Sequence, residues 1–205
     1  PTPSPAPTRP EAREQTDDDC GRPLVLRRAD AIAQGCTDAE LARAVRRQEL
    51  IRLQRGADVD RTEAIPDDAL QRHALVVAAT VAGMKVPGVV SHASAAALHA
   101  LPLWRVPLGR VHVLRPPPAA GSGSARVHRH VVRLPDDDVT LVEGVLATGI
   151  TRTVVDVART ASFESAVVLA DRALRVRGTT REQLVECLDR MGPFPGSRLA
   201  ARVIA

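Results

Sequence analysis

The chain has 205 residues, of which 44% are hydrophobic, so it is long enough for one large or two modest domains with ordinary cores. Its formal net charge is +4, but Lys85 is the only lysine among 28 basic residues, and an arginine bias can follow from genome composition. The total charge therefore does not by itself indicate a nucleic-acid partner. Three cysteines without a close pair exclude a disulfide framework and a zinc-finger spacing, and no apolar run approaches the roughly 20 residues of a membrane span. These features favour a cytoplasmic protein with no membrane partner.

The first segments along the chain predict a tail and a small domain. Residues 1–19 are proline-rich and polar, which is typical of a disordered tail and not of a signal peptide. Within residues 20–65, RRADAIAQG predicts a short helix closed by Gly35, and Thr37 with Glu40 forms a capping box that opens a second helix. LIRLQRGADV then predicts a hairpin. Helix, turn, helix and hairpin is the order of a winged helix-turn-helix domain.

Residues 69–205 predict a second, mixed α/β domain that ends in a helical region. DRTEAIPDDA, acidic and containing Pro66, looks like the connector before it. Helices are expected at 69–83 and 92–101, with Ser91 as a possible cap of the latter, and a short strand at 88–91. RVHVLRP, ARVHRHVVRLP and VTLVEGVLATG alternate like strands, and from Thr151 onward the pattern is helical. The expected fold class is α+β.

The second helix of the small domain separates an apolar face from a basic face. At about 100° per residue, one side of a helix that begins at Asp38 collects Leu41, Ala44, Val45 and Gln48. Arg43, Arg46 and Arg47 fall on nearly the opposite side. A helix-turn-helix needs this division, because its second helix packs on the first while its other face enters the major groove.

The predicted hairpin continues the basic surface. Arg52 and Gln54 alternate with two apolar residues, and Arg55 is at the tip, where a wing reaches a phosphate or the minor groove. The competing interpretation is a solvated basic face, which any surface helix of an arginine-rich protein can show. The coincidence of charge with helix, turn, helix and hairpin favours DNA contact.

Four stretches together resemble the AbiEi family of antitoxins from type IV toxin-antitoxin systems. They are RRADAIAQGCTDAELARAVRRQELIRLQRGADVD near the start, SHASAAALHALPLW with RVHVLRP in the middle, and GITRTVVDVART before the last helices. The resemblance covers nearly all of residues 22–205. It implies a winged-helix domain at residues 20–65 and an antitoxin domain at residues 69–205.

The resemblance also implies the partners. Family members repress their own operon by binding promoter repeats, and they counteract a nucleotidyltransferase toxin encoded beside them. DNA contact would then fall on Arg43, Arg46, Arg47, Arg52 and Arg55, with operator DNA and the cognate toxin as partners and a homo-oligomer on DNA as a possibility. Relatives usually have an aromatic residue where this chain has Asp58, and an acid near phosphates predicts a weakened wing. The alternative is a protein-interaction module that neutralises the toxin but has lost DNA binding.

The remaining polar residues do not form a coherent catalytic or metal site, so neither an enzyme nor a cofactor is expected. His92 and His99 lie seven residues apart on one helix, where close packing is favoured over metal binding. His112, His128 and His130 are interpreted as surface or partly buried sheet residues. Finally, the spacing of Arg152, Asp156 and Arg159 predicts an ion-pair ladder, more often solvated or between domains than a binding patch.

Overall fold

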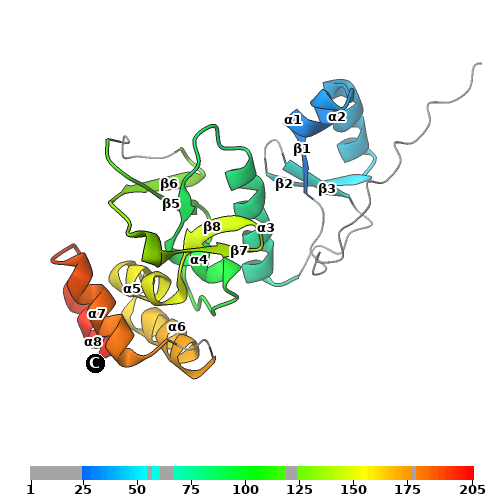
Figure 1. The fold of residues 1–205 in the computed structure, drawn as a ribbon. Helices are drawn as coiled ribbons and strands as arrows, with labels where there is room; N and C mark the ends of the chain where they lie inside the picture. The colour runs from blue at the N-terminus through cyan, green and yellow to red at the C-terminus, as the bar shows by residue number, and fades with distance from the viewer. Residues whose placement is uncertain (1–24, 55–56, 61–66, 119–123, 177–178) are drawn as a thin grey trace, which may run out of the picture.

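The protein is described by a computed structural model that covers residues 25–54, 57–60, 67–118, 124–176 and 179–205. The predicted α+β fold class is confirmed. Figure 1 shows a small N-terminal unit at one end, a mixed sheet with its helices in the middle, and a group of helices at the other end. The tail predicted for residues 1–19 lies outside the described residues. Among the described helices, none is both long and apolar enough to cross a bilayer.

The N-terminal unit consists of two short helices on a three-stranded antiparallel sheet. Its elements are β1 (Val25–Arg27), α1 (Arg28–Ala33), α2 (Asp38–Arg46), β2 (Leu50–Gln54) and β3 (Ala57–Asp60). The strand order is β1-β3-β2. Gly35 adopts a left-handed φ of 97° where α1 ends, and Thr37 and Glu40 form the predicted capping box. Strand β1 was not expected, because three residues are too few to show an alternating pattern.

The core of the N-terminal unit is small, and the unit packs against helix α3 of the second unit. Its buried apolar residues are Ala31, Leu41, Ala57 and Val59. Strand β1 lies against α3, and the Arg27 guanidinium donates a hydrogen bond to the Ala82 carbonyl at the end of that helix. A core of this size is marginal by itself, so contact with α3 contributes to its stability.

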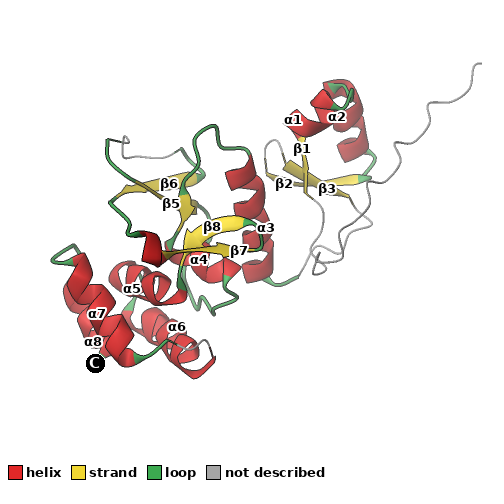
Figure 2. Cartoon of the chain, in the orientation of Figure 1, coloured by secondary structure: helices red, strands yellow, loops and turns green. Residues whose placement is uncertain are grey.

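The second unit is built on a five-stranded mixed sheet, drawn in yellow among red helices in Figure 2. Its first elements are α3 (Ala69–Ala82), β4 (Val89–Val90), α4 (His92–Leu98), β5 (Val111–Arg115), β6 (Val127–Val131), the 3-10 helix η1 (Asp136–Asp138), β7 (Val139–Val142) and β8 (Val145–Thr148). The strand order is β6-β5-β4-β8-β7, with β5–β6 and β4–β8 parallel and the other pairs antiparallel.

Small side chains allow α4 to sit at the centre of this unit. Every residue from His92 to Leu98 is buried, and α4 packs against α3, α5 and strand β5. Its alanines let these neighbours approach closely, while Val77, Val90 and Val113 fill the space between helix and sheet. Each such buried valine stabilises the fold by about 1.5–3 kcal/mol relative to an exposed one.

Four helices close the chain and share a second core. They are α5 (Ile150–Thr160), α6 (Phe163–Val176), α7 (Arg181–Met191) and α8 (Ser197–Ile204). Val154, Leu169 and Leu184 are fully buried between them. Gly196, with φ of 84°, lies directly against the Arg159 carbonyl, and an added Cβ would come within 2.0 Å of that oxygen. Glycine is therefore required where α8 meets α5.

Two local features differ from the sequence prediction. Ser91 precedes α4 but makes no side-chain cap, because its Oγ is hydrogen-bonded to His92 Nδ1 at 3.0 Å. The segment VTLVEGVLATG is a hairpin of β7 and β8 and not one strand, since Glu143 and Gly144 both adopt positive φ at the turn.

Candidate functional site

The exposed basic face of α2 is formed by Arg43, Arg46 and Arg47, which we call the α2 arginines. All three side chains are exposed, whereas Leu41 on the other side of the helix is 8% exposed. The predicted separation of faces is therefore present. Helix α2 ends at Arg46, however, and Gln48 has φ of 60°, so Gln48 is not on the apolar face where it was expected.

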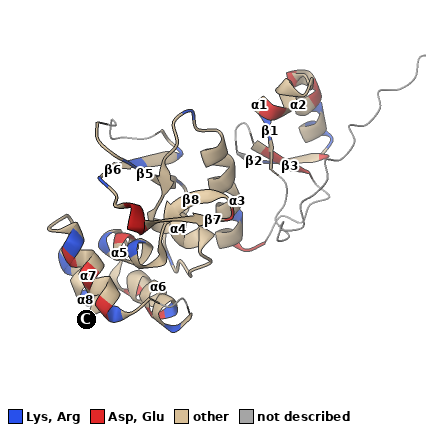
Figure 3. Cartoon of the chain, in the orientation of Figure 1, with Lys and Arg blue, Asp and Glu red and all other residues tan. Residues whose placement is uncertain are grey.

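The acidic residues of α2 lie in its first turn and are matched locally, whereas the arginines lie toward its last turn (Figure 3). Glu40 accepts the backbone N–H of Thr37 at 2.8 Å, which lowers the pKa of this carboxyl. Asp38 is paired with Arg28. Directly after the helix, Arg47 lies 3.9 Å from Glu49, with both side chains well exposed. Arg43 and Arg46 are left as the dominant charges of the exposed face.

The predicted wing arginines have different surroundings. Arg52 Nε donates to Asp58 Oδ1 at 3.0 Å, and the Asp58 side chain is only 4% exposed. Asp58 is thus a buried partner of Arg52 across strands β2 and β3, and it does not face phosphates as the sequence suggested. The Arg52 guanidinium remains half exposed. Arg55 lies outside the described residues.

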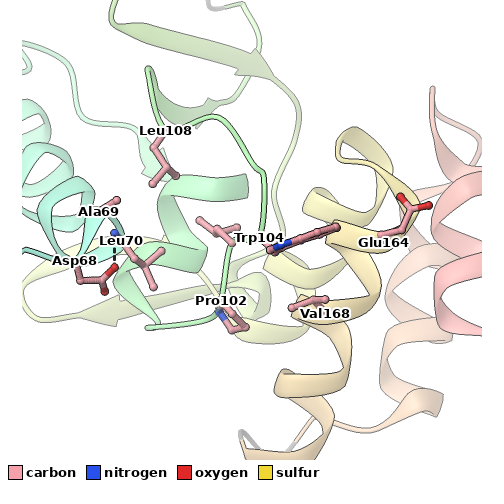
Figure 4. A pocket seen from close by; sticks show the side chains of 9 residues that line it. Asp68, Ala69, Leu70, Pro102, Trp104, Leu108, Glu164 and Val168 are labelled. Atoms are coloured by element: carbon pink, nitrogen blue, oxygen red, sulfur yellow. Dashed lines mark hydrogen bonds between the residues drawn. The ribbon is translucent and has the colours of Figure 1, made fainter.

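An apolar hollow of about 780 Å³ lies between the start of α3, the segment after α4 and the start of α6 (Figure 4). Trp104, 45% exposed, and Val168 contribute apolar surface, and Asp68 and Glu164 are the acids that line it. The Arg105 guanidinium lies 4.6 Å from the centre of the Trp104 ring, in cation–π geometry. Such a surface suits apolar side chains of a ligand or partner.

The ladder predicted on α5 is present but buried. Arg152 Nε lies 3.2 Å from Asp156, and Arg152 Nη1 lies 2.9 Å from Asp138 in η1, with all three side chains almost fully buried. Arg159 lies 4.0 Å from Asp156, and Arg190 on α7 also pairs with Asp138. This network joins η1, α5 and α7 within the second unit, so the prediction of a solvated or interdomain ladder was wrong.

Histidines that the sequence treated separately meet on one face of the sheet. His112 Nδ1 lies 3.0 Å from His130 Nε2, and the His130 ring stacks on His92 at 3.9 Å between centroids and on His128 at 4.3 Å. His99 is different, because its Nε2 donates to the Thr148 carbonyl at 2.8 Å, in the packing role predicted for it. Alternation in each strand was visible in the sequence, but the parallel pairing of β5 with β6 was not.

The imidazoles of His92, His112 and His130 are neutral at neutral pH. Burial, aided by the neighbouring histidines, lowers the pKa of His112 to about 4. Burial and the nearby His128 and Arg159 lower the pKa of His130 to about 4 as well. Burial also lowers the pKa of His92 well below its ordinary value. Neutral rings can stack without charge repulsion, and they keep a lone pair for an ion or a donor.

Comparisons with known proteins bear on the second unit most directly. A family model described as "AbiEi antitoxin C-terminal domain" matches residues 86–200. Among solved structures, the chain is similar to the RV2827C protein from Mycobacterium tuberculosis, with 18% identity and a TM-score of 0.54 over 89% of this chain and 71% of that one. That likeness shows a shared fold. No curated protein matches the chain.

Proposed function

The chain belongs to the AbiEi antitoxin family, and on this premise we propose that it neutralises a nucleotidyltransferase-like toxin and represses its own operon by binding DNA. The family consists of regulatory proteins and not of enzymes. In this proposal the chain acts in the cytoplasm without catalysis, and its partners are operator DNA and the cognate toxin. Residues 20–65 serve DNA binding and residues 69–205 serve neutralisation.

The observation that carries the DNA-binding part is the exposed face of α2. Residues 25–60 hold seven arginines and six acidic residues, so the unit is close to neutral and its total charge favours no partner. The distribution of charge on α2 favours a negatively charged partner. The acidic residues of the first turn are paired or used in capping, whereas the side chains of the α2 arginines are exposed. Arginine pairs with guanine in the major groove and with phosphate. Two copies on adjacent repeats would increase the number of such contacts.

The test separates repression from neutralisation in cells. A reporter under the gene's own promoter measures repression, and survival during toxin expression measures neutralisation. Replacing the α2 arginines by alanine should release the reporter and leave survival unchanged, because these side chains lie outside the second unit. A matched control replaces Arg172, Arg175 and Arg198 by alanine, which removes the same charge from exposed positions on α6 and α8. Repression should persist in this control.

Each outcome has a clear meaning. If the α2 variant still represses as the parent does, α2 is not the DNA-binding element. If the parent chain gives no survival with the toxin of its own operon, the neutralising role is wrong. Circular dichroism of both variants must first confirm that each is folded.

One observation favours the alternative, a toxin-neutralising module without DNA binding. The guanidinium of Arg52, which a wing would direct at DNA, is held by Asp58 at 3.0 Å. A gel shift with the DNA upstream of the gene separates the two proposals. Retarded DNA supports a DNA-binding repressor. DNA that is not retarded at physiological salt, together with survival in the toxin assay, supports a neutralising module without DNA binding.

A further inference from the structure

Three histidines from three elements bring their ring nitrogens close together. His92 begins α4, His112 lies on β5 and His130 on β6, and one ring nitrogen from each lies within 4.8 Å of the other two. The parallel register pairs His112 with His128, and alternation returns His130 to the same face of the sheet. The start of α4 packs on β5 and brings His92 to that face.

The spacing of these nitrogens is close to that of a tetrahedral metal site. At Zn–N distances of about 2.0–2.1 Å, neighbouring ligand nitrogens are about 3.3 Å apart. The His112 Nδ1 and His130 Nε2 atoms are already 3.0 Å apart. The His92 and His130 rings are stacked at 3.9 Å between centroids, so on binding an ion His92 would have to turn out of this stack.

His92 is held in a way that suits a ligand. Its Nδ1 is hydrogen-bonded to Ser91 Oγ at 3.0 Å, which orients the ring and leaves Nε2 for an ion. Its backbone has φ of 51°, a left-handed conformation that costs free energy in most residues. The surrounding fold maintains this backbone conformation and keeps the ring beside those of His112 and His130.

Arginines face the cluster, but carboxylates pair with two of them and offset part of their positive charge. Arg152 and Arg159 on α5 face His92, but they are paired with Asp156, and Arg152 also with Asp138. Among the described residues, Arg110 and the largely buried His73 also act on His112. The imidazoles themselves are neutral, as metal ligands must be.

We propose that His92, His112 and His130 bind one Zn²⁺ ion, with a water molecule as the fourth ligand. The water has a route, because a hollow of about 520 Å³ beside the cluster is lined by His112, His128 and the end of α5 around Thr160. The partial negative charge at the C-terminus of a helix favours a cation nearby. Imidazole ligands with an open position suit Zn²⁺ among the common metals. The ion would tie α4 to strands β5 and β6.

The experiment uses the full chain without a histidine tag, treated with a chelator and then dialysed. Cys20 and Cys36 are changed to serine so that these thiols cannot bind the metal, while buried Cys187, whose pKa burial raises to about 11, stays protonated. Calorimetric titration with Zn²⁺ should give one ion per chain. With Zn²⁺ at a hundred times its dissociation constant, the melting temperature of the second unit should rise by roughly 5–10 °C. Co²⁺ should give the intense visible absorption of a four-coordinate site.

Single alanine variants assign the ligands. His112→Ala and His130→Ala should weaken Zn²⁺ binding by at least about a hundredfold, more than the loss of an outer-shell partner. His128→Ala is the matched control, because His128 lies exposed on the same face of the sheet but is not one of the three, and it should bind as the parent does. Melting curves without metal establish that each variant is folded. Absence of binding in the parent, normal binding in the His112 or His130 variant, or an equal loss in the His128 variant would overturn the proposal.

Discussion

Arginines on α2 and on α5 show how one residue type takes two opposite roles. The α2 arginines lie exposed on a short helix over a small core, whereas Arg152 of α5 is buried between two carboxylates in the middle of the second unit. An exposed arginine adds little to stability but is available to a partner. A buried and paired arginine is required by the fold, because its removal leaves the partner carboxylate as a buried charge with neither an ion-pair partner nor solvent.

The difference arises from what surrounds each helix. Helix α2 packs against strand β2 of the small sheet, and its arginine side chains are exposed to solvent. Helix α5 is packed by α4, α6, α7 and α8, so its polar residues Arg152, Thr153 and Asp156 are all buried. Burial, and not charge or spacing, therefore separates the arginines that are available to a partner from those that the fold requires.

The largest expected effect comes from breaking the buried network. Arg152→Ala leaves Asp138 and Asp156 without their shared partner and should lower the free energy of unfolding by about 3–5 kcal/mol. Denaturant unfolding followed by circular dichroism measures this change. Faster reaction of the Cys187 thiol with a thiol reagent should accompany it, since Cys187 lies in the same core. A loss below about 1 kcal/mol would mean that Arg152 is not needed for the fold.

A smaller effect is expected at the wing. Asp58→Tyr, which would restore the aromatic residue of relatives, places a large ring at a buried position and removes the partner of Arg52. Overpacking of this kind costs about 1–3 kcal/mol, so the N-terminal unit should melt at a lower temperature. DNA affinity should not rise. Tighter DNA binding with unchanged melting would show that Asp58 faces the DNA after all.

The smallest effect is expected for an exposed pair with the same spacing as the buried one. Arg175 Nε lies 2.9 Å from Asp171 on α6, also four residues apart, but both side chains are more than half exposed. Arg175→Ala should change the free energy of unfolding by less than about 1 kcal/mol. Denaturant unfolding run beside the Arg152 variant checks this. Equal losses in the two variants would contradict the distinction between buried and exposed arginines.

Local signals made much of the fold predictable. The capping box at Thr37 and Glu40, the left-handed Gly35 and the periodicity of α3 and α5–α8 depend on neighbours in the sequence. The exposed face of α2 followed from the same periodicity.

Features that depend on distant residues were missed. The pairing of Asp138 with Arg152 and Arg190 required the packing of separate elements. The pairing of Arg52 with Asp58 required the register of the predicted hairpin, which shifts between Arg52 and Gln54. The histidine cluster required the parallel register of β5 and β6. Alternation shows that His112 and His130 each occupy one face of a strand, but not which strands are neighbours.

DNA binding by the full chain as a function of salt tests the central claim most directly. Fluorescence anisotropy with the DNA upstream of the gene gives the dissociation constant at several salt concentrations for the parent, for the α2 variant with Arg43, Arg46 and Arg47 replaced by alanine, and for the Arg172, Arg175 and Arg198 control. Each lost base contact should cost about 1–3 kcal/mol, and each lost phosphate contact should reduce the salt slope by about 1. Our account predicts weaker binding and a flatter slope in the α2 variant only. Equal affinities and slopes for all three proteins would contradict it.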